Sequence, residues 1–376
     1  MKAARLVLWP WWLVQVFGQG KSFQDNPILG SKTLNTLGLH AARYALGHAM
    51  VSWRRLLLSP LASAEHRRQF RENGFVVVRD VLPPEDYARI CDEARRAHGP
   101  GAPGELRECV QGDTVTRMML LDGRTLQAMP ATAAFVRDRS LAGLLMYIAG
   151  RRKRPLFLTH VVHNGVASGS VDPQKALHSD TFHSTMKGWY FLGDVRPQDG
   201  PFTYVPGSHR FSRRRMAWER EISIHACEHG NRYSAKGSLR LTEEDRLRLG
   251  YPEPVQLAVP GNTLVIADTH GFHRRGDAEG GAVRVAIYAS SRSNPFNPLP
   301  GLLPSLAGWI ESRGLAWSWR GADRRAAARG GLPSWRRVPA EALPEVERQV
   351  SSVLPGAGGR PQTQTWASPP CETKAA

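Results

Sequence analysis

The stretch GWYFLGDVRPQDGPFTYVPGSHR, residues 188–210, contains two short apolar segments separated by residues that form turns. The segments GWYFLGDV and FTYVPG are rich in the aromatic and β-branched residues that strands prefer. Between them, PQDGP combines proline, aspartate and glycine, a composition typical of turns. This stretch therefore predicts two short strands joined by a turn.

The same pattern extends in both directions, from Pro155 to about Ser290. Further strand-like segments are PLFLTHVV, ALHSD, VQLAV, TLVIAD and AVRVAIYAS, and VPGN and GDAEGG separate some of them. Many short strands punctuated by glycine and proline favour a β-sandwich or a jelly roll.

Helices are expected in the N-terminal half of the chain. Residues 62–74 predict a helix that ends at Gly74, and residues 83–99 predict another, with acidic residues in its first turn and basic residues in its last. A further helix is expected over 131–150. In the second helix one apolar face is formed by Tyr87, Ile90, Cys91 and Ala94, which predicts that Cys91 belongs to the core. The fold class expected is mainly β with flanking helices.

The 376-residue chain is strongly basic, with 50 Lys and Arg against 33 Asp and Glu, a net charge of +17 and a pI near 10.4. Such a charge attracts anionic partners, but it does not choose among nucleic acid, anionic lipid and an acidic small molecule. No specific nucleic-acid motif is visible. The four cysteines form no C-x-x-C pair, which fits a reducing, cytoplasmic setting.

An apolar run, LVLWPWWLVQVF, occupies residues 6–17. As a helix its twelve residues rise only about 18 Å, too little for a bilayer core of about 30 Å, and Pro10 interrupts it. No A-x-A cleavage pattern follows, which argues against a signal peptide. Its tryptophans would suit peripheral contact with a membrane, whereas the simpler alternative is an apolar arm packed on the domain.

Composition suggests three parts. Residues 1–62 are expected to form an N-terminal extension with a short apolar arm, and residues 63–300 the main domain. Residues 301–376 are expected to form a C-terminal extension whose last segment, PGAGGRPQTQTWASPPCETKAA, has the composition of a disordered tail.

The segment ALHSD offers adjacent metal ligands. In a strand, His178 and Asp180 point to the same face, so an imidazole and a carboxylate lie side by side. One more histidine would complete a two-histidine, one-carboxylate set that leaves three positions open on Fe(II). The candidates for that third ligand are His160, His163, His183, His209, His270 and His273.

From about Gln69 to Arg292 the sequence resembles the phytanoyl-CoA dioxygenase family of non-haem Fe(II)- and 2-oxoglutarate-dependent oxygenases. The resemblance is carried, in family order, by FRENGFVVVRDVLPPEDYARICDEARR, HSD, GWYFLGDVRPQDGPFTYVPGSHR, PGNTLVIADTHGFHRRG and AVRVAIY. It implies a double-stranded β-helix, the jelly roll of cupin-like barrels, over residues 63–300.

The resemblance also implies roles for individual residues. It makes His178, Asp180 and His273 the iron ligands, because family members have an arginine eleven residues after the last histidine, and Arg284 stands there. The eleventh residue after His270 is a glycine. Arg284 would hold the distal carboxylate of 2-oxoglutarate, which a planar guanidinium can bind through two hydrogen bonds. Trp189 would line the co-substrate side of the cavity, although a core tryptophan is an equal alternative.

The implied reaction is hydroxylation of a small molecule with release of succinate and CO2. A carboxylate at position 180 favours hydroxylation, since halogenating relatives have a small residue there. The basic surface would suit an acidic or CoA-linked substrate, and the apolar arm a lipid-like one. Two other functions remain as alternatives: a cupin-type metal enzyme that does not use 2-oxoglutarate, and a catalytically silent basic jelly roll that acts as a binding or scaffold protein.

Overall fold

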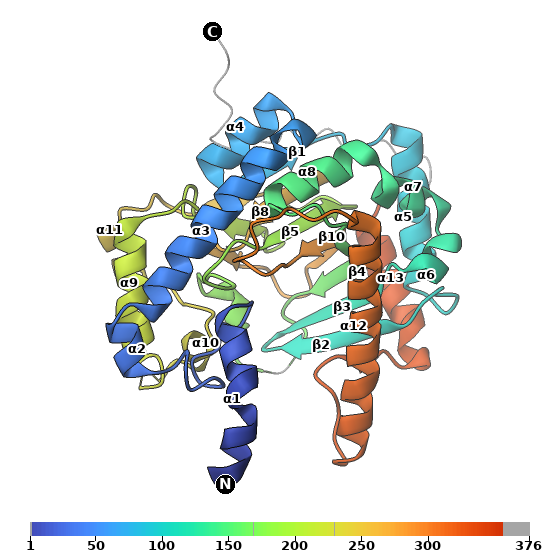
Figure 1. The fold of residues 1–376 in the computed structure, drawn as a ribbon. Coiled ribbons are helices and arrows are strands. Elements are labelled where there is room, and N and C mark those ends of the chain that lie inside the picture. The colour runs from blue at the N-terminus through green and yellow to red at the C-terminus, as the bar shows by residue number, and fades with distance from the viewer. Residues whose placement is uncertain (1, 168, 229, 356–376) are drawn as a thin grey trace.

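The computed structural model describes residues 2–167, 169–228 and 230–355, in which the strands form two antiparallel sheets (Figure 1). The large sheet has the order β1-β8-β5-β10-β4-β3-β2-β11, and the small sheet has the order β7-β6-β9. The predicted disordered tail lies, from residue 356 onward, outside the described residues. The strand bounds are β1 (Phe75–Val78), β2 (Leu106–Gln111), β3 (Thr114–Leu120), β4 (Leu156–His163), β5 (Met186–Phe191), β6 (Phe202–Tyr204), β7 (Val255–Leu257), β8 (Thr263–Asp268), β9 (His273–Arg275), β10 (Val283–Ser291) and β11 (Arg336–Arg337).

Eight consecutive segments of the chain, from β4 to β10 and including residues 176–180, belong to one or other of the two sheets. The large sheet receives β4, β5, β8 and β10, while β6, β7 and β9 belong to the small one. The remaining segment, residues 176–180 between β4 and β5, joins the edge of the small sheet through a bridge between His178 and His273. This arrangement is a double-stranded β-helix, so the predicted jelly roll is confirmed.

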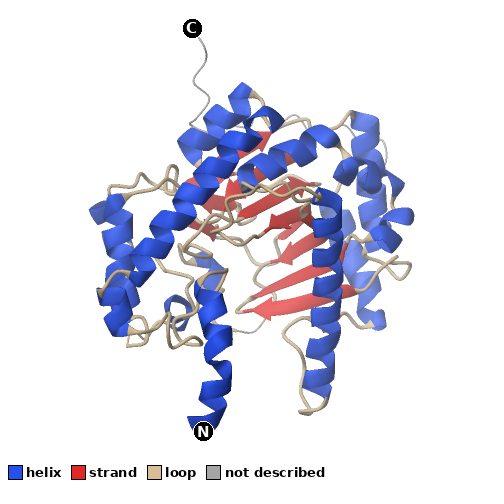
Figure 2. Cartoon of the chain, viewed as in Figure 1, coloured by secondary structure: helices blue, strands red, loops and turns tan. Residues whose placement is uncertain are grey.

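Alternating residues of the large sheet serve two separate cores. On β8, Leu264 and Ile266 pack with the helices outside the sheet, whereas Val265 and Ala267 pack between the two sheets. Helices cover the outer face of the large sheet (Figure 2). The helix bounds are α1 (Lys2–Val16), α2 (Lys32–Thr36), α3 (Leu39–Leu58), α4 (Ala64–Asn73), α5 (Pro84–Ala97), α6 (Gly123–Gln127), α7 (Pro130–Arg137), α8 (Arg139–Ala149), α9 (Arg213–His225), α10 (Arg232–Ala235), α11 (Glu243–Leu249), α12 (Pro304–Ala327) and α13 (Leu343–Val353), and 3-10 turns occupy Ser59–Leu61, Pro173–Lys175 and Ala340–Ala342.

A third apolar cluster joins the N-terminal segment to the long connection between β6 and β7. Phe23 and Leu29 of the N-terminal segment belong to the same buried cluster as Trp218 of α9. A buried hydrogen-bond contact reinforces this packing, because His40 Nε2 of α3 lies 2.8 Å from Glu219 Oε2. The N-terminal segment is therefore packed into the fold.

Several expected elements are confirmed. Helix α4 ends at Gly74, whose positive φ of 88° is the left-handed conformation that favours glycine. Helix α5 buries Cys91 together with the other residues of the predicted apolar face. Among the helices of the described residues, none combines the length and the apolar character that a bilayer span requires.

Three expectations on secondary structure need correction. The single helix expected over 131–150 is two helices, because Asp138 caps α8 by accepting a hydrogen bond from the backbone N–H of Leu141. The expected strand ALHSD is only a bridge at His178. Strands β2 and β3 were not expected at all.

Replacement of Ile266 by alanine should destabilise the protein by about 2–5 kcal/mol, because this side chain is fully buried beneath the helices and its removal leaves a cavity. Urea unfolding followed by circular dichroism measures the change. The control is Val110→Ala on β2, where the side chain is largely exposed, and it should stay within about 0.5 kcal/mol of wild type. Equal effects at the two positions would contradict the assigned core.

Candidate metal centre

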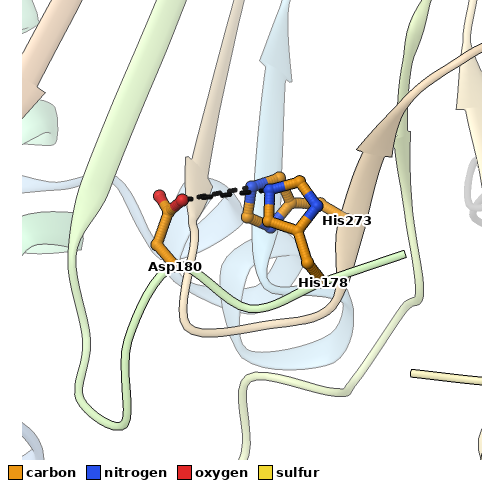
Figure 3. A group of neighbouring side chains, drawn as sticks. All are labelled: His178, Asp180 and His273. Carbon is orange, nitrogen blue, oxygen red and sulfur yellow. Dashed lines mark ion pairs between the residues drawn. The ribbon is translucent and has the colours of Figure 1, made fainter. Parts of the chain in front are cut away.

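Three buried side chains meet at the edge of the small sheet (Figure 3). Asp180 Oδ1 lies 4.0 Å from His178 Nε2 and 3.9 Å from His273 Nε2, and one ligand atom from each residue lies within 4.8 Å of the others. The two imidazole rings lie 4.5 Å apart between centroids. Two nitrogens and one carboxylate oxygen at this spacing can bind one metal ion.

Backbone hydrogen bonds fix the two histidines opposite each other. The N–H of His178 donates to the carbonyl of His273, and the N–H of His273 donates back, each at 2.9 Å. The N–H of Asp180 donates to the carbonyl of Thr269, also at 2.9 Å. Although 176–180 is not a regular strand, its backbone is held firmly enough that His178 and Asp180 both point toward His273, as Figure 3 shows.

The tautomer of each histidine follows from its backbone contact. Nδ1 of His178 lies 2.8 Å from the carbonyl of Ala176, and Nδ1 of His273 lies 2.9 Å from the carbonyl of Gly271. Because a carbonyl only accepts, both Nδ1 atoms must carry the proton, which leaves the Nε2 lone pairs directed at Asp180. Among the described residues, the buried Nε2 of His178 has no hydrogen-bond partner.

Burial favours the neutral form of both imidazoles. It lowers the pKa of His178 well below its ordinary value, and the neighbouring His273 lowers it further. Burial also lowers the pKa of His273 to about 4, although Asp180 opposes the shift. Neutral imidazole is the form that binds metal, so both rings are in the ligand state at neutral pH.

The Asp180 carboxylate is held in its charged form. Burial alone would raise its pKa, but Lys187 and the two histidines lower it well below the ordinary value. Lys187 Nζ of β5 lies 2.7 Å from Asp180 Oδ2. Sequence reasoning missed this lysine, although its position two residues before Trp189 places both on the same face of a strand.

The cluster opens into a cavity of about 400 Å³, and Arg284 and Trp189 line the same cavity. The structure thus brings together all five residues singled out in the sequence. Other side chains that line the cavity are His160, Lys187, Tyr288, Arg292 and Trp335. Of these, Trp335 comes from the C-terminal extension, and no sequence signal pointed to it.

Arg284 on β10 is a buried cation without a paired anion. Its Nε atom has no hydrogen-bond partner among the described residues, and no carboxylate there forms an ion pair with it. Burial, and to a smaller extent the nearby Arg275, lower the pKa of Arg284 to about 9, while Asp199 and Asp172 oppose the shift. Arg275 is neutralised by Asp172 at 2.6 Å, so Arg284 is left to face the cavity with its own charge.

Trp189 forms an aromatic wall of the cavity. Its ring centroid lies 4.6 Å from Phe202 and 5.8 Å from Tyr288. The side chain is half-buried: it packs against the apolar cluster between the sheets and also lines the cavity.

The other candidate histidines do not join the cluster. His270 Nε2 lies 3.0 Å from His48 Nε2 of α3, and its Nδ1 contacts the carbonyl of Thr181. His160 lines the cavity on β4, whereas His163 points to the opposite face. The two remaining residues, His183 and His209, are buried outside the cavity lining.

The turn between β8 and β9, which carries His273 at its far end, is anchored by Asp268. This carboxylate contacts Arg55 Nη2 of α3 at 2.9 Å, accepts from Ser184 Oγ at 2.6 Å and accepts from the N–H of His270 at 3.0 Å. Burial alone would raise the pKa of Asp268, but Arg55 and Ser184 bring it below its ordinary value. Arg55, in the N-terminal extension, thus supplies a positive charge that helps to fix the turn leading to His273.

A double-stranded β-helix with a buried set of two histidines and one carboxylate defines a class of metal-dependent enzymes. The family model Phytanoyl-CoA dioxygenase (PhyH) matches residues 70–246. The chain matches the phytanoyl-CoA dioxygenase family over this part of its length, and it is an oxidoreductase of the Fe(II)- and 2-oxoglutarate-dependent class.

The solved structures that the chain resembles at low identity include the following three. The epimerase SnoN, in complex with Fe3+, alpha ketoglutarate and nogalamycin RO, is 18% identical over 60% of this chain and 83% of its own, with a TM-score of 0.42. HygX from Streptomyces hygroscopicus, with nickel, 2-oxoglutarate and hygromycin B bound, is 15% identical over 61% of this chain and 86% of its own, with a TM-score of 0.36. EctD from S. alaskensis with bound Fe is 14% identical over 66% of this chain and 85% of its own, with a TM-score of 0.37. No curated protein matches the chain.

Replacement of Asp268 by asparagine should destabilise the protein by about 1–3 kcal/mol at neutral pH, because the partly buried Arg55 loses its counter-charge. The folded-state pKa of Asp268 is lowered, so its stabilisation is present above the unfolded-state pKa, near 4, and is lost as pH falls through the folded value. The difference between wild type and variant should therefore shrink on acidification below about pH 4.

Urea unfolding across this pH range measures the difference. In the control Glu65→Gln, the carboxylate is on the surface, and the stability should change little. A difference for Asp268→Asn that stays constant through the acid range would contradict the ion pair.

Proposed function

We propose that this chain is a hydroxylase in which His178, Asp180 and His273 hold Fe(II), and Arg284 binds the distal carboxylate of 2-oxoglutarate. The observation that carries the proposal is the unpaired, buried Arg284 in the same cavity as the three ligand side chains. A buried cation costs free energy unless an anion pairs with it, so this position suits a carboxylate ligand. Trp189 would form the wall beside that ligand.

The donor set fits ferrous iron. Two neutral imidazole nitrogens and one carboxylate oxygen leave adjacent positions free toward the cavity, unlike a structural zinc site, which closes its tetrahedron with a fourth protein ligand. Iron with 2-oxoglutarate would supply the activation of O2, coupled to decarboxylation of the co-substrate to succinate and CO2 and to insertion of oxygen into a C–H bond.

The residues of the chain would orient the reactants and keep the ligands in their charge states. Burial keeps both imidazole rings neutral, and hydrogen bonds from Nδ1 to backbone carbonyls fix their orientation and tautomer. Lys187 pairs with the second oxygen of Asp180, which would leave a single carboxylate oxygen for the metal. The carboxylate at position 180 supports hydroxylation, because it occupies the position that a halide would need.

The rim of the cavity supports an acidic small-molecule substrate. Arg274 and Arg292 line the cavity in addition to Arg284, and Arg292 is exposed and forms no ion pair among the described residues. A substrate carboxylate, or the phosphate of a CoA-linked or lipid-like substrate, would be complementary to this charge. We further propose that residues 6–17 touch a membrane surface, which is supported by the exposure of Trp9 and Trp11.

The proposed ligand set predicts a spectroscopic signature. Anaerobic addition of Fe(II) and then 2-oxoglutarate to wild type should produce the weak visible charge-transfer band of the iron chelate. His178→Ala, Asp180→Ala and His273→Ala should each abolish or strongly weaken it. His270→Ala serves as the matched control, since His270 contacts His48 and lies outside the cluster. A full band in His178→Ala or Asp180→Ala would contradict the assignment.

Arg284→Gln should weaken 2-oxoglutarate binding by about tenfold or more, because the distal carboxylate loses a charged, two-pronged partner. The titration of the same band with 2-oxoglutarate measures the change, while the affinity for Fe(II) alone should remain as in wild type. Arg274→Gln, at the rim, is the control that removes one positive charge from the same cavity. An unchanged 2-oxoglutarate affinity in Arg284→Gln would favour a cupin-type enzyme that does not use this co-substrate.

A turnover assay that measures succinate distinguishes an enzyme from a catalytically silent binding protein. Wild type with Fe(II), 2-oxoglutarate and O2 should release succinate slowly without substrate, and faster with the correct acidic substrate. The Asp180→Ala protein should release none above background. The absence of succinate from the iron-loaded wild type would favour the scaffold function.

A further inference from the structure

Helices α1 and α12, with the segments beside them, expose many large apolar side chains. Helices α1 and α12 both project beyond the sheets in the same direction (Figure 1). On and beside them, eleven large apolar side chains are more than half exposed: Trp9, Trp11, Leu13, Val14, Phe17, Leu299, Leu302, Leu303, Trp309, Ile310 and Trp317. Large exposed apolar patches on a folded protein mark interaction sites.

Helix α12 places its apolar and basic residues on one open face. It has 24 residues and buries none of them. Leu303, Leu306, Ile310, Arg313 and Trp317 follow each other at spacings of three and four, so they form one stripe that faces solvent. Arg313 lies over the ring of Trp309 at 4.7 Å, an arrangement that keeps both groups at the surface.

The charged side chains that α12 itself contributes to this open face are all basic. The two carboxylates of α12 are turned toward the body of the protein, where Glu311 pairs with Lys153 at 2.9 Å and Asp323 pairs with Arg107 at 2.7 Å. The exposed arginines that remain are Arg313, Arg320, Arg324 and Arg325, and none of them pairs with a carboxylate in the described part of the chain. An anionic surface is complementary to this face.

Both helices are attached at the mouth of the cavity. In the sequence, helix α12 comes after Arg292 and before Trp335, and both of these residues line the cavity. The end of α1 contacts the segment that leads into α12, since Asn294 Nδ2 donates to the carbonyl of Phe17 at 3.0 Å. A surface bound by these helices would therefore lie beside the entrance to the metal centre.

We infer that α1 and α12 form one docking face for an anionic lipid bilayer, with tryptophan and leucine side chains inserted at the interface and the arginines of α12 on the headgroups. Paired apolar and basic residues on a helix that lies at the surface are the features that bind such membranes. A second copy of the chain is a poorer occupant, because its identical face would bring four arginines against four arginines. The inference does not depend on the identity of the metal or of the co-substrate.

The test uses the full-length protein and vesicles. Wild type should float with vesicles of phosphatidylcholine mixed with phosphatidylglycerol, should not float with phosphatidylcholine alone, and should dissociate as salt increases. Binding should also shift the tryptophan fluorescence to shorter wavelength. Equal binding to both vesicle types, or no binding to either, would overturn the inference.

A charge-matched pair of variants locates the basic part of the face. Arg324→Gln with Arg325→Gln should weaken binding to the anionic vesicles at least about tenfold. Arg213→Gln with Arg214→Gln removes the same charge from α9, across the molecule from α12, and should leave binding close to wild type. Equal losses in the two variants would show that net charge, and not this face, attracts the vesicles.

A second pair locates the apolar part. Trp309→Ser with Trp317→Ser should weaken binding at least about tenfold, whereas Leu37→Ser with Leu247→Ser, at exposed positions elsewhere, should not. Thermal unfolding by circular dichroism checks that each variant folds. Sedimentation of the protein without vesicles gives a separate outcome: a dimer that the Trp309 and Trp317 changes dissociate would assign the face to a second copy and overturn the membrane inference.

Discussion

Two backbone hydrogen bonds between His178 and His273 hold the metal centre together, because they join segments that lie 95 positions apart in the sequence. They set the register in which the 176–180 segment meets β9. A shift by one residue would turn His178 away from the cavity and bring Ser179 in its place. The large sheet, the helices behind it and the Asp268 anchor all keep the ends of β8 and β9 where this register is possible.

Arg284, which lines the same cavity, shows that this fold accommodates an unpaired buried charge. Arg284 is buried without a counter-charge, which costs free energy in the protein alone. Arg284 pairs with Val162 of β4, and the rest of β10 is paired with β4 and β5 on its two sides, so the strand has little freedom to release the charge to solvent. In the proposed function, a bound carboxylate would offset this local cost in stability.

The sequence predicted much of the barrel and of the site because both depend on short-range signals. Strands such as TLVIAD have strong β propensity and are flanked by glycine or proline, and the spacing from His273 to Arg284 spans only the short connection from β9 to β10. Strands β2 and β3 escaped prediction because charged residues interrupt them. Arg107 is buried in β2, where Asp323, 216 residues later, pairs with it. Trp335 also lines the cavity through tertiary contacts, and no local sequence pattern predicts its position there. The three-part division of the chain remains a prediction.

Helix α3 has a consequence for how the protein is made. It is synthesised early, yet His48 bonds to a residue 222 positions later and Arg55 pairs with one 213 positions later. Until the end of β8 and the turn after it have left the ribosome, His48 and Arg55 of this helix lack these partners. Such long-range closure slows folding and leaves apolar surface open to aggregation in the nascent chain. We therefore expect expression to be limited by chaperone capacity and growth temperature more than by the stability of the finished fold.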